Sequence, residues 1–213
     1  MTWVVTACVS GDSFGFNYRP EHVFRLFCQV EEHADGRNLS YAVVTDLDDV
    51  EWAEHDVTPI WNEPSWPGWW SKLHLFGHDF VSRAVYFDLD TAIVGDIGRL
   101  LDHDPGEHLD MLLDVGNRQH PMSACFAWNG SPRKHWCDDV EVSTPRFYSD
   151  QEYLARKACR PGEIRFLQDS LPGMFGSLKE WTRPTPGDPV NASDAPVRLW
   201  HGDGKERFFR GWP

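Results

Sequence analysis

Three segments at the start of the chain decide the fold. Residues 3–9 read WVVTACV, residues 20–33 read PEHVFRLFCQVEEH, and residues 39–45 read LSYAVVT. The first and third are apolar, β-branched runs without a helical period, which predicts buried strands. In the second, apolar residues recur at intervals of three and four, which predicts an amphipathic helix that begins at Pro20. Strand, helix, strand is the unit of a parallel sheet, so the sequence predicts an α/β fold.

Further apolar runs extend the predicted sheet. Short strands of this sheet are expected at 84–87, 111–113 and 124–128, and one further short strand is expected at 197–200. Ser149 with Glu152 three residues later matches a capping box, which predicts a helix that starts with Asp150 and ends before Pro161. Residues 183–196 are rich in proline and are expected to form a surface loop.

Composition limits the class of protein. The chain has 213 residues, 41% of them hydrophobic and 25% charged, which fits a globular domain and excludes disorder, collagen and coiled coil. Lys and Arg number 20 against 33 Asp and Glu, a net charge of −13. Because phosphate binding needs clustered basic residues, this charge argues against extensive nucleic-acid binding. A small basic groove from Arg156, Lys157 and Arg160 is left open.

Two features bear on localisation. No apolar run approaches the roughly 18 residues of a membrane span, and the opening MTWVVTACVSG lacks the basic region of a signal peptide. The five cysteines are odd in number and form no C-x-x-C pair, which predicts reduced thiols. We therefore expect a cytoplasmic protein without a membrane span.

Tryptophan is unusually common, with 11 residues. Four of them cluster in WNEPSWPGWW at residues 61–70. Two interpretations stay open for this cluster, because large aromatic rings both stack on sugars and nucleobases and fill hydrophobic cores.

The main chemical motif lies in RAVYFDLDTAIVGDI, residues 83–97. An apolar strand ends in Asp88 and Asp90, and positions two apart in an extended segment share a face. Both carboxylates are therefore expected to point at one cation beyond the strand's carboxyl end, where α/β sheets bind ligands. Hard oxygen ligands suit Mg²⁺ or Mn²⁺ bridging to phosphates. The alternative is that the two acids only form a turn.

A second motif, RLWHGDGKE, occupies residues 198–206. The neutral imidazole of His201 can complete a metal site. Gly202 and Gly204 let the backbone approach a pyrophosphate, and Lys205 can neutralise phosphate charge.

With these motifs the chain resembles the glycosyltransferases of the GT-A fold, specifically the family 8, glycogenin-like group. The resemblance rests on VVTACVSGDSF, YAVVTD, PGWWSKLHLF, VYFDLDTAIVGDI, SACFAWNG, SDQEYL and HGDGK, which follow one another along most of the chain. It implies a single GT-A (Rossmann-like) domain with a mostly parallel central sheet flanked by helices. Residues 1–100 would form the nucleotide-binding half, and residues 101–213 the acceptor half with a closing C-terminal loop.

The resemblance also implies roles for individual residues. It assigns Mn²⁺, or Mg²⁺, to three ligands: Asp88, Asp90 and His201. It assigns three residues to catalysis beside the donor sugar and its diphosphate: Asp150, Gln151 and Lys205. It places the following residues against the nucleotide sugar: Ala7, Val9, Ser10, Asp12, Asp46, Lys72, Asp88, Leu89, Gly202, Gly204 and Lys205.

The activity implied is that of a metal-dependent, retaining hexosyltransferase with a UDP-sugar as donor. The acceptor is a hydroxyl group that no motif identifies, and a saccharide and a modified base of phage DNA are both left open. As the sugar–phosphate bond breaks, the cation and Lys205 would neutralise the diphosphate leaving group.

Two other classes of protein compete with this interpretation. FDLDTAI, residues 87–93, also resembles the first motif of haloacid-dehalogenase-like phosphatases, in which Asp88 would be the nucleophile. Its position far from the chain's start argues against that assignment. A non-enzymatic carbohydrate- or nucleotide-binding protein is the third possibility, and retention of all three candidate metal ligands argues against it.

Overall fold

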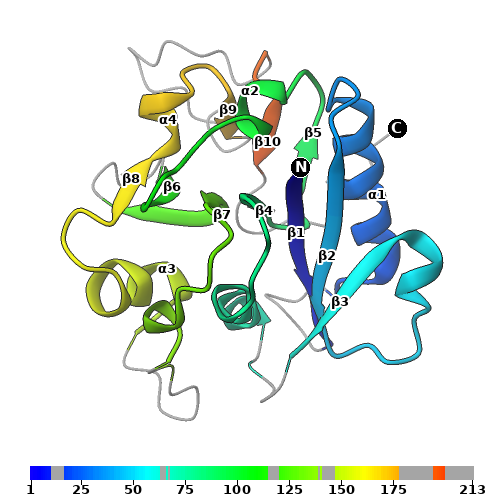
Figure 1. Ribbon diagram of the computed structural model, residues 1–213, viewed down its shortest axis with the longest axis horizontal. Helices are drawn as coiled ribbons and strands as arrows, with labels where there is room; N and C mark the ends of the chain where they lie inside the picture. Colours follow the sequence, from blue (N-terminus) through cyan, green and yellow to red (C-terminus); the bar gives the residue numbers. More distant parts are fainter. Residues whose placement is uncertain are drawn as a thin grey trace.

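The computed structural model describes residues 1–10, 17–62, 66, 68–114, 120–138, 140, 147–177 and 194–199. Within this part of the chain, a seven-stranded sheet with the order β3-β2-β1-β4-β7-β6-β8 forms the centre of the molecule (Figure 1). Its strands are β1 (Thr2–Cys8), β2 (Leu39–Thr45), β3 (Val57–Trp61), β4 (Ala84–Phe87), β6 (Leu109–Leu113), β7 (Pro121–Trp128) and β8 (Ile164–Phe166). A second sheet consists of β5 (Thr91–Ile93), β10 (Val197–Leu199) and β9 (Phe175–Ser177).

Helical segments connect these strands. The α-helices are α1 (Pro20–Glu32), α2 (Gly98–Leu101), α3 (Asp150–Tyr153) and α4 (Leu167–Ser170). The 3₁₀ helices are η1 (Trp52–His55), η2 (Gly68–Gly77) and η3 (Lys134–Trp136), and a π-helical turn, η4 (Leu154–Ala158), continues α3. No helix of the described residues has both the length and the apolar character that a membrane crossing requires.

The predicted opening unit is confirmed. β1 pairs in parallel with β2, in a register that runs from Thr2 opposite Leu39 to Cys8 opposite Thr45. Helix α1 starts at Pro20, as expected, and crosses between the two strands. It buries one stripe of apolar side chains: Val23, Leu26, Phe27 and Val30. Each such side chain stabilises the fold by about 1.5–3 kcal/mol when fully buried.

The central sheet is mostly parallel, as predicted. β3, β2, β1 and β4 run parallel to one another, β7 pairs antiparallel with both β4 and β6, and β8 pairs in parallel with β6. Apolar residues cover both of its faces. Val4 of β1 packs in the same core cluster as α1, and the adjacent Val5 packs in a second cluster with Leu73 and Phe76 of η2. Because successive side chains point to opposite faces, a strand buried on both sides is apolar throughout.

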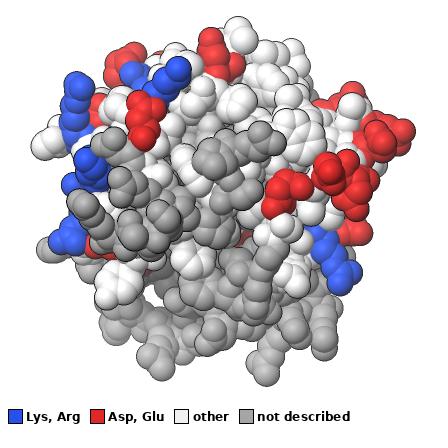
Figure 2. All heavy atoms as spheres, turned by 90° about the horizontal axis from the view of Figure 1, so that it is seen from below, with Lys and Arg blue, Asp and Glu red and all other residues white. Residues whose placement is uncertain are grey.

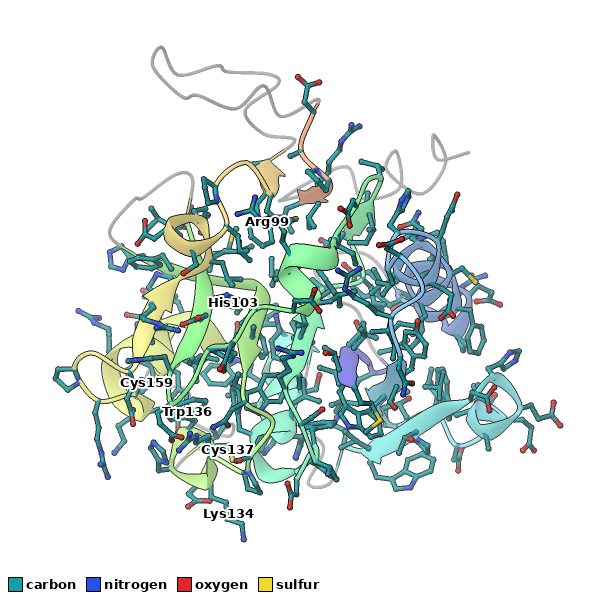
Figure 3. All side chains as sticks on the ribbon, turned by 45° about the horizontal axis from the view of Figure 1, so that its top comes forward. Arg99, His103, Lys134, Trp136, Cys137 and Cys159 are labelled. Carbon is teal, nitrogen blue, oxygen red and sulfur yellow. The ribbon has the colours of Figure 1, made fainter. Side chains whose placement is uncertain are left out.

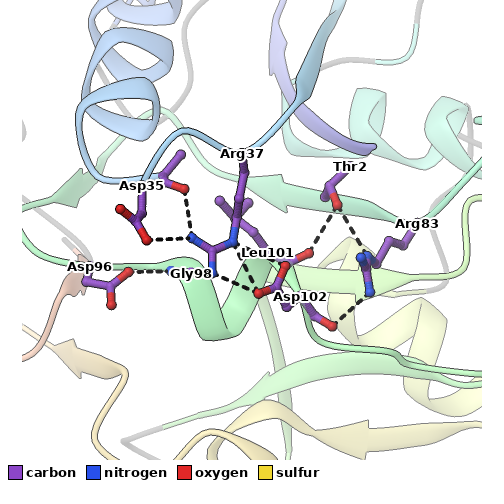
Figure 4. A network of polar contacts seen from close by, with 9 residues as sticks. Thr2, Asp35, Arg37, Arg83, Asp96, Gly98, Leu101 and Asp102 are labelled. Atoms are coloured by element: carbon purple, nitrogen blue, oxygen red, sulfur yellow. Dashed lines mark hydrogen bonds and ion pairs between the residues drawn. The ribbon is translucent and has the colours of Figure 1, made fainter.

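Polar contacts tie down the amino end of the sheet (Figure 4). Arg37, in the loop before β2, donates to Asp102 after α2, with Nη2 2.8 Å from Oδ2. Arg83 donates to the carbonyl of Asp102 at 2.8 Å, and the Thr2 hydroxyl donates to the carbonyl of Leu101 at 3.1 Å. These bonds join the beginnings of β1, β2 and β4.

The cysteines carry free thiols, as expected. Figure 3 shows Cys137, Cys159 and the buried Trp136 in one part of the molecule, and the two partly buried cysteines pack against the core cluster that contains Trp136. Burial raises the pKa of Cys137 to about 11 and that of Cys159 to about 12. Both thiols therefore stay protonated, and weakly nucleophilic, at neutral pH.

The last predicted strand is confirmed. The strand expected at 197–200 forms as β10, which joins β5 and β9 in the small sheet. Residues 183–193 of the expected proline-rich loop lie outside the described residues. The strands β3, β5, β8 and β9 and the helix η2 were not predicted.

Candidate functional site

The candidate site lies where four parallel strands end. The chain builds β1, β2 and β3 outward in one direction and then places β4 on the other side of β1, so the strand order reverses between β1 and β4. Such a reversal opens a crevice at the carboxyl ends of the strands, where α/β sheets bind ligands. One polar residue follows each strand: Ser10, Asp46, Asn62 and Asp88.

Ser10 and Asp46 join the ends of β1 and β2. The backbone N–H of Ser10 donates to Oδ1 of Asp46 and its hydroxyl donates to Oδ2, both at 2.6 Å. The structure thus brings together two of the residues expected at the nucleoside. Ala7 and Val9, from the same segment, are half-buried, and Asp12 lies outside the described residues.

Asn62, which sequence reasoning missed, closes the loop after β3. Its backbone N–H donates to the carbonyl of Thr45 at 2.9 Å. Its side-chain amide donates to the carbonyl of Trp66 at 3.0 Å and accepts from the N–H of Trp66 at 3.2 Å. Asn62 is 3% exposed. Asparagine directly after a strand is a common turn residue and is the one signal that could have marked it.

The tryptophan cluster divides between core and surface. Trp70 is buried against Tyr153, with ring centroids 5.9 Å apart. Trp66 stacks on His74 at 3.9 Å and an interplanar angle of 20°. Trp61, at the end of β3, is 48% exposed. The core interpretation therefore holds for Trp70, whereas Trp61 is available to a ligand.

The segment with Asp88 and Asp90 is a turn, so the expectation that it is extended was wrong. β4 ends at Phe87, and the N–H of Thr91 donates back to the carbonyl of Asp88 at 3.1 Å, which turns the chain into β5. Leu89 between the two acids is 2% exposed, and its carbonyl accepts from Arg25 at 2.9 Å. Both acids nonetheless lie beyond the end of a strand.

Asp90 is buried, with 6% of its surface exposed. Its carboxylate accepts a hydrogen bond from the Tyr18 hydroxyl. Burial and the negative charges of Asp90 and Asp88 raise the pKa of Tyr18, which keeps the phenol protonated as a donor.

Asp88 has two donors on one oxygen. Its Oδ1 accepts from Nζ of Lys72 at 2.7 Å and from the hydroxyl of Tyr86 at 2.6 Å. Among the described residues no donor reaches its other oxygen, Oδ2, and the side chain is 29% exposed. As far as the described residues go, one hard carboxylate oxygen of Asp88 is thus left for a further ligand.

Lys72 of η2 links the acids of the site. Its Nζ also donates to the carbonyl and the hydroxyl of Ser123, both at 3.3 Å, and lies 3.7 Å from Oδ2 of Asp150. The side chain is 3% exposed. Burial by itself lowers the pKa of Lys72, but the charges of Asp150 and Asp88 outweigh it and raise the pKa above its usual value. Lys72 is therefore a buried cation between two carboxylates.

Asp150 and Gln151 begin helix α3, as predicted. The hydroxyl of Ser149 accepts from the N–H of Glu152 at 3.2 Å and caps the helix. The expected capping box is only half formed, because the Glu152 carboxylate accepts from the N–H of Tyr148 at 2.9 Å instead of that of Ser149. The expected helix also changes to a π-helical turn from Leu154 to Ala158.

The acid at the start of α3 is buried beside β7. Asp150 has a side chain 4% exposed, and none of the described residues donates a hydrogen bond to its Oδ2. Burial raises its pKa, which Lys72 and a hydrogen bond from Ser123 partly offset. The N–H of Ser123 donates to Oε1 of Gln151 at 3.3 Å. Ser123, which sequence reasoning missed, thus connects Lys72, Asp150 and Gln151.

The C-terminal residues expected at the site lie outside the described residues: His201, Gly202, Gly204 and Lys205. Within the described residues, no group of three or more His, Cys, Asp or Glu is arranged to hold a metal ion. The donor chemistry of the two acids nevertheless fits a hard cation. The Asp88 side chain is partly exposed, its Oδ2 accepts from no donor among the described residues, and Asp90 follows two residues later in the same turn.

Charge is unevenly distributed at this end of the molecule (Figure 2). Acidic side chains gather on the side where Figure 1 places β3, and basic ones are found mainly on the opposite side. Between β2 and β3 the exposed acids are Asp48, Asp49, Glu51, Glu54 and Asp56. This acidic side is unsuited to a phosphate backbone.

No protein-family model matches the chain, and no curated protein matches it by sequence. Solved structures do match. A crystal structure of the galactosyltransferase LgtC in complex with donor and acceptor sugar analogues matches with a TM-score of 0.64 and 13% identity, over 98% of this chain and 94% of that chain. The glycosyltransferase GlyE of Streptococcus pneumoniae matches with a TM-score of 0.60 and 12% identity; 98% of this chain spans 59% of GlyE. The predicted fold class is confirmed: the α/β fold is that of these glycosyltransferase structures.

Proposed function

We propose that this protein is a glycosyltransferase that moves a hexose from a nucleotide-diphosphate sugar to a hydroxyl acceptor. One observation carries the proposal. Lys72 holds Asp88 and Asp150 together at the edge where the strand order reverses, in the fold of an enzyme solved with donor and acceptor sugar analogues. The phosphatase alternative finds no support in the structures named above, which are glycosyltransferases.

Different parts of the donor would bind at different strand ends along the edge of the sheet. Asp46, held by Ser10 at the ends of β1 and β2, would bind the nucleoside of a UDP-sugar. Asp88 and Asp90, with His201, would hold Mn²⁺ or Mg²⁺. The cation, when bound, supplies positive charge to the diphosphate leaving group. Lys205 would add a second positive charge at the same oxygens.

The donor sugar would lie toward α3. Asp150 and Gln151 would orient the hexose, and the buried carboxylate of Asp150 would stabilise positive charge that develops at its anomeric carbon. We propose that the configuration at that carbon is retained. We further propose that the acceptor is a saccharide or a modified DNA base. Because the five cysteines carry free thiols, we propose the cytoplasm as the location of the protein.

The test measures ligand binding and turnover separately. UDP, UDP-glucose and UDP-galactose are added with Mn²⁺ or with EDTA, and thermal unfolding is followed. A ligand at a hundredfold excess over its dissociation constant stabilises by about 2.7 kcal/mol, or roughly 5–10 °C for a chain of this size. We expect such a shift with at least one of these ligands, and only when Mn²⁺ is present.

Turnover is then measured as hydrolysis of the donor that gives the shift. Asp88→Ala and Asp90→Ala should abolish it, whereas Asp48→Ala, which removes an exposed acid outside the site, should not. Unchanged turnover in both site variants would refute the assignment. Absence of any shift, together with Mg²⁺-dependent hydrolysis of p-nitrophenyl phosphate, would support the phosphatase instead.

A further inference from the structure

Tyr86 of β4 has one fixed position in the core. The antiparallel register of β4 and β7 places it directly opposite Phe126. Their rings stack with centroids 4.5 Å apart and an interplanar angle of 13°. Tyr86 is 1% exposed, and a side chain so closely packed keeps a single rotamer.

Tyr86 contacts two charged side chains of the site, those of Asp88 and Lys72. Asp88 follows Tyr86 by two positions, and the phenol donates to its Oδ1 at 2.6 Å. Nζ of Lys72 lies 5.0 Å from the centroid of the ring, within the range of a cation–π interaction. The hydroxyl and the ring face of Tyr86 therefore act on both members of the Lys72–Asp88 ion pair.

We infer that Tyr86 is a positioning residue for the cation site. With Oδ1 of Asp88 occupied by Tyr86 and Lys72, the carboxylate has a fixed orientation that leaves Oδ2 for the cation. Groups that hydrogen-bond metal ligands fix the direction of those ligands, and removing one typically weakens metal affinity by about 10–100-fold. This inference rests on the proposed function, because it assumes that Asp88 binds the cation.

The hydroxyl is tested apart from the ring. Tyr86→Phe deletes the bond to Asp88 and keeps both the stacking on Phe126 and the aromatic face under Lys72. The matched control is Tyr41→Phe on β2, which also deletes one phenolic hydrogen bond, from Tyr41 to Glu31 at 2.5 Å. Glu31 belongs to α1 and not to the site.

Free Mn²⁺ is measured by electron paramagnetic resonance while the full chain is titrated at a fixed concentration of UDP. Each titration is run at least 20 °C below the unfolding midpoint of the variant, so that a folded protein is compared in every case. We expect Mn²⁺ affinity to fall about tenfold or more in Tyr86→Phe and to stay at the wild-type value in Tyr41→Phe.

The outcomes separate the two proposals. Equal Mn²⁺ affinity in Tyr86→Phe and the wild type overturns the role of Tyr86 and leaves the proposed function standing. A lower unfolding midpoint with unchanged affinity does the same, because it shows a structural role alone. A wild-type protein that binds no Mn²⁺ overturns the metal-dependent function and this inference with it.

Discussion

The side-chain nitrogen of Lys72 lies 2.7 Å from Oδ1 of Asp88, although the two residues are 16 positions apart in the chain. The same nitrogen lies 3.7 Å from Oδ2 of Asp150. One buried ammonium thus offsets the repulsion between the carboxylate after β4 and the carboxylate that begins α3. Removing one partner of a buried ion pair is costly, because the remaining charges lose both solvent and counter-ion.

Lys72→Met is therefore expected to destabilise the protein. The side chain keeps its length and apolar stem but leaves Asp88 and Asp150 without a cation, so the free energy of unfolding should fall by about 3–5 kcal/mol at neutral pH. Urea denaturation measures this change. The control is Lys134→Met, at an exposed lysine of η3, which should leave the midpoint unchanged. Equal midpoints for the two variants would show that the Lys72 pairs contribute no stability.

Asp150→Asn is expected to separate stability from activity. Burial raises the pKa of Asp150 in the folded state, so its contribution to stability is present below the unfolded pKa and is lost as pH rises through the folded pKa. Asparagine cannot ionise and avoids that loss. Lys72 keeps its closer ion pair with Asp88, so the variant should be at least as stable as the wild type at pH 7. Donor hydrolysis should fall roughly 100-fold, because the site loses a fixed negative charge.

Thermal unfolding between pH 4 and 8, together with the hydrolysis assay, checks this prediction. Asp169→Asn, at an exposed aspartate of α4, is the matched control and should change neither quantity. A variant at Asp150 that is less stable than the wild type at pH 7 would contradict the sign of the effect.

The contribution of Asp110 to stability should depend on pH in the opposite direction to that of Asp150. Burial alone would raise its pKa, but His103, at 2.6 Å, and Arg165, whose Nε and Nη2 lie 2.8 Å from its two oxygens, lower it. Its stabilising effect is thus present above the unfolded pKa and is lost as pH falls through the folded pKa. Asp110→Asn should cost about 3 kcal/mol at pH 7 and progressively less below pH 4.

The comparison for Asp110 is the exposed pair of Arg37 and Asp102. Their side chains are 28% and 58% exposed, and solvent-exposed pairs contribute little. In urea denaturation Asp102→Asn should therefore lower stability less than Asp110→Asn. The reverse order would mean that burial is not what gives the Asp110 cluster its effect.

Gly130 should tolerate no side chain. Its φ is +79°, and a Cβ atom there would lie 1.6 Å from the carbonyl oxygen of Ser82 and 2.3 Å from that of Phe80. Gly106 has a similar φ of +57° but no atom within 4 Å of such a Cβ. Gly106→Ala should cost about 1–2 kcal/mol of backbone strain. Gly130→Ala should cost several times more in the same denaturation assay, and equal losses would contradict the close approach.

The sequence alone predicted β1, α1 and β2, and it predicted which strand and which helix the acids Asp88 and Asp150 border. The strands before and after α1 and the helix itself are visible because their apolar periods are local, and Pro20 marks where the helix starts. The acids Asp88 and Asp150 were placed correctly, one after a strand and one at a helix start, because these boundaries have local signals too.

Tertiary structure decided what those acids contact. β3, which contains Pro59, and the three-residue strands β5, β8 and β9 form only by pairing with distant strands, so no local pattern predicts them. Asp88 and Asp90 lie in a turn and not on one extended face, because the backbone turns into β5. Ser123 reaches Lys72 across 51 positions of sequence. Such contacts depend on how strands and helices pack, and hydrophobic periodicity carries no information about them.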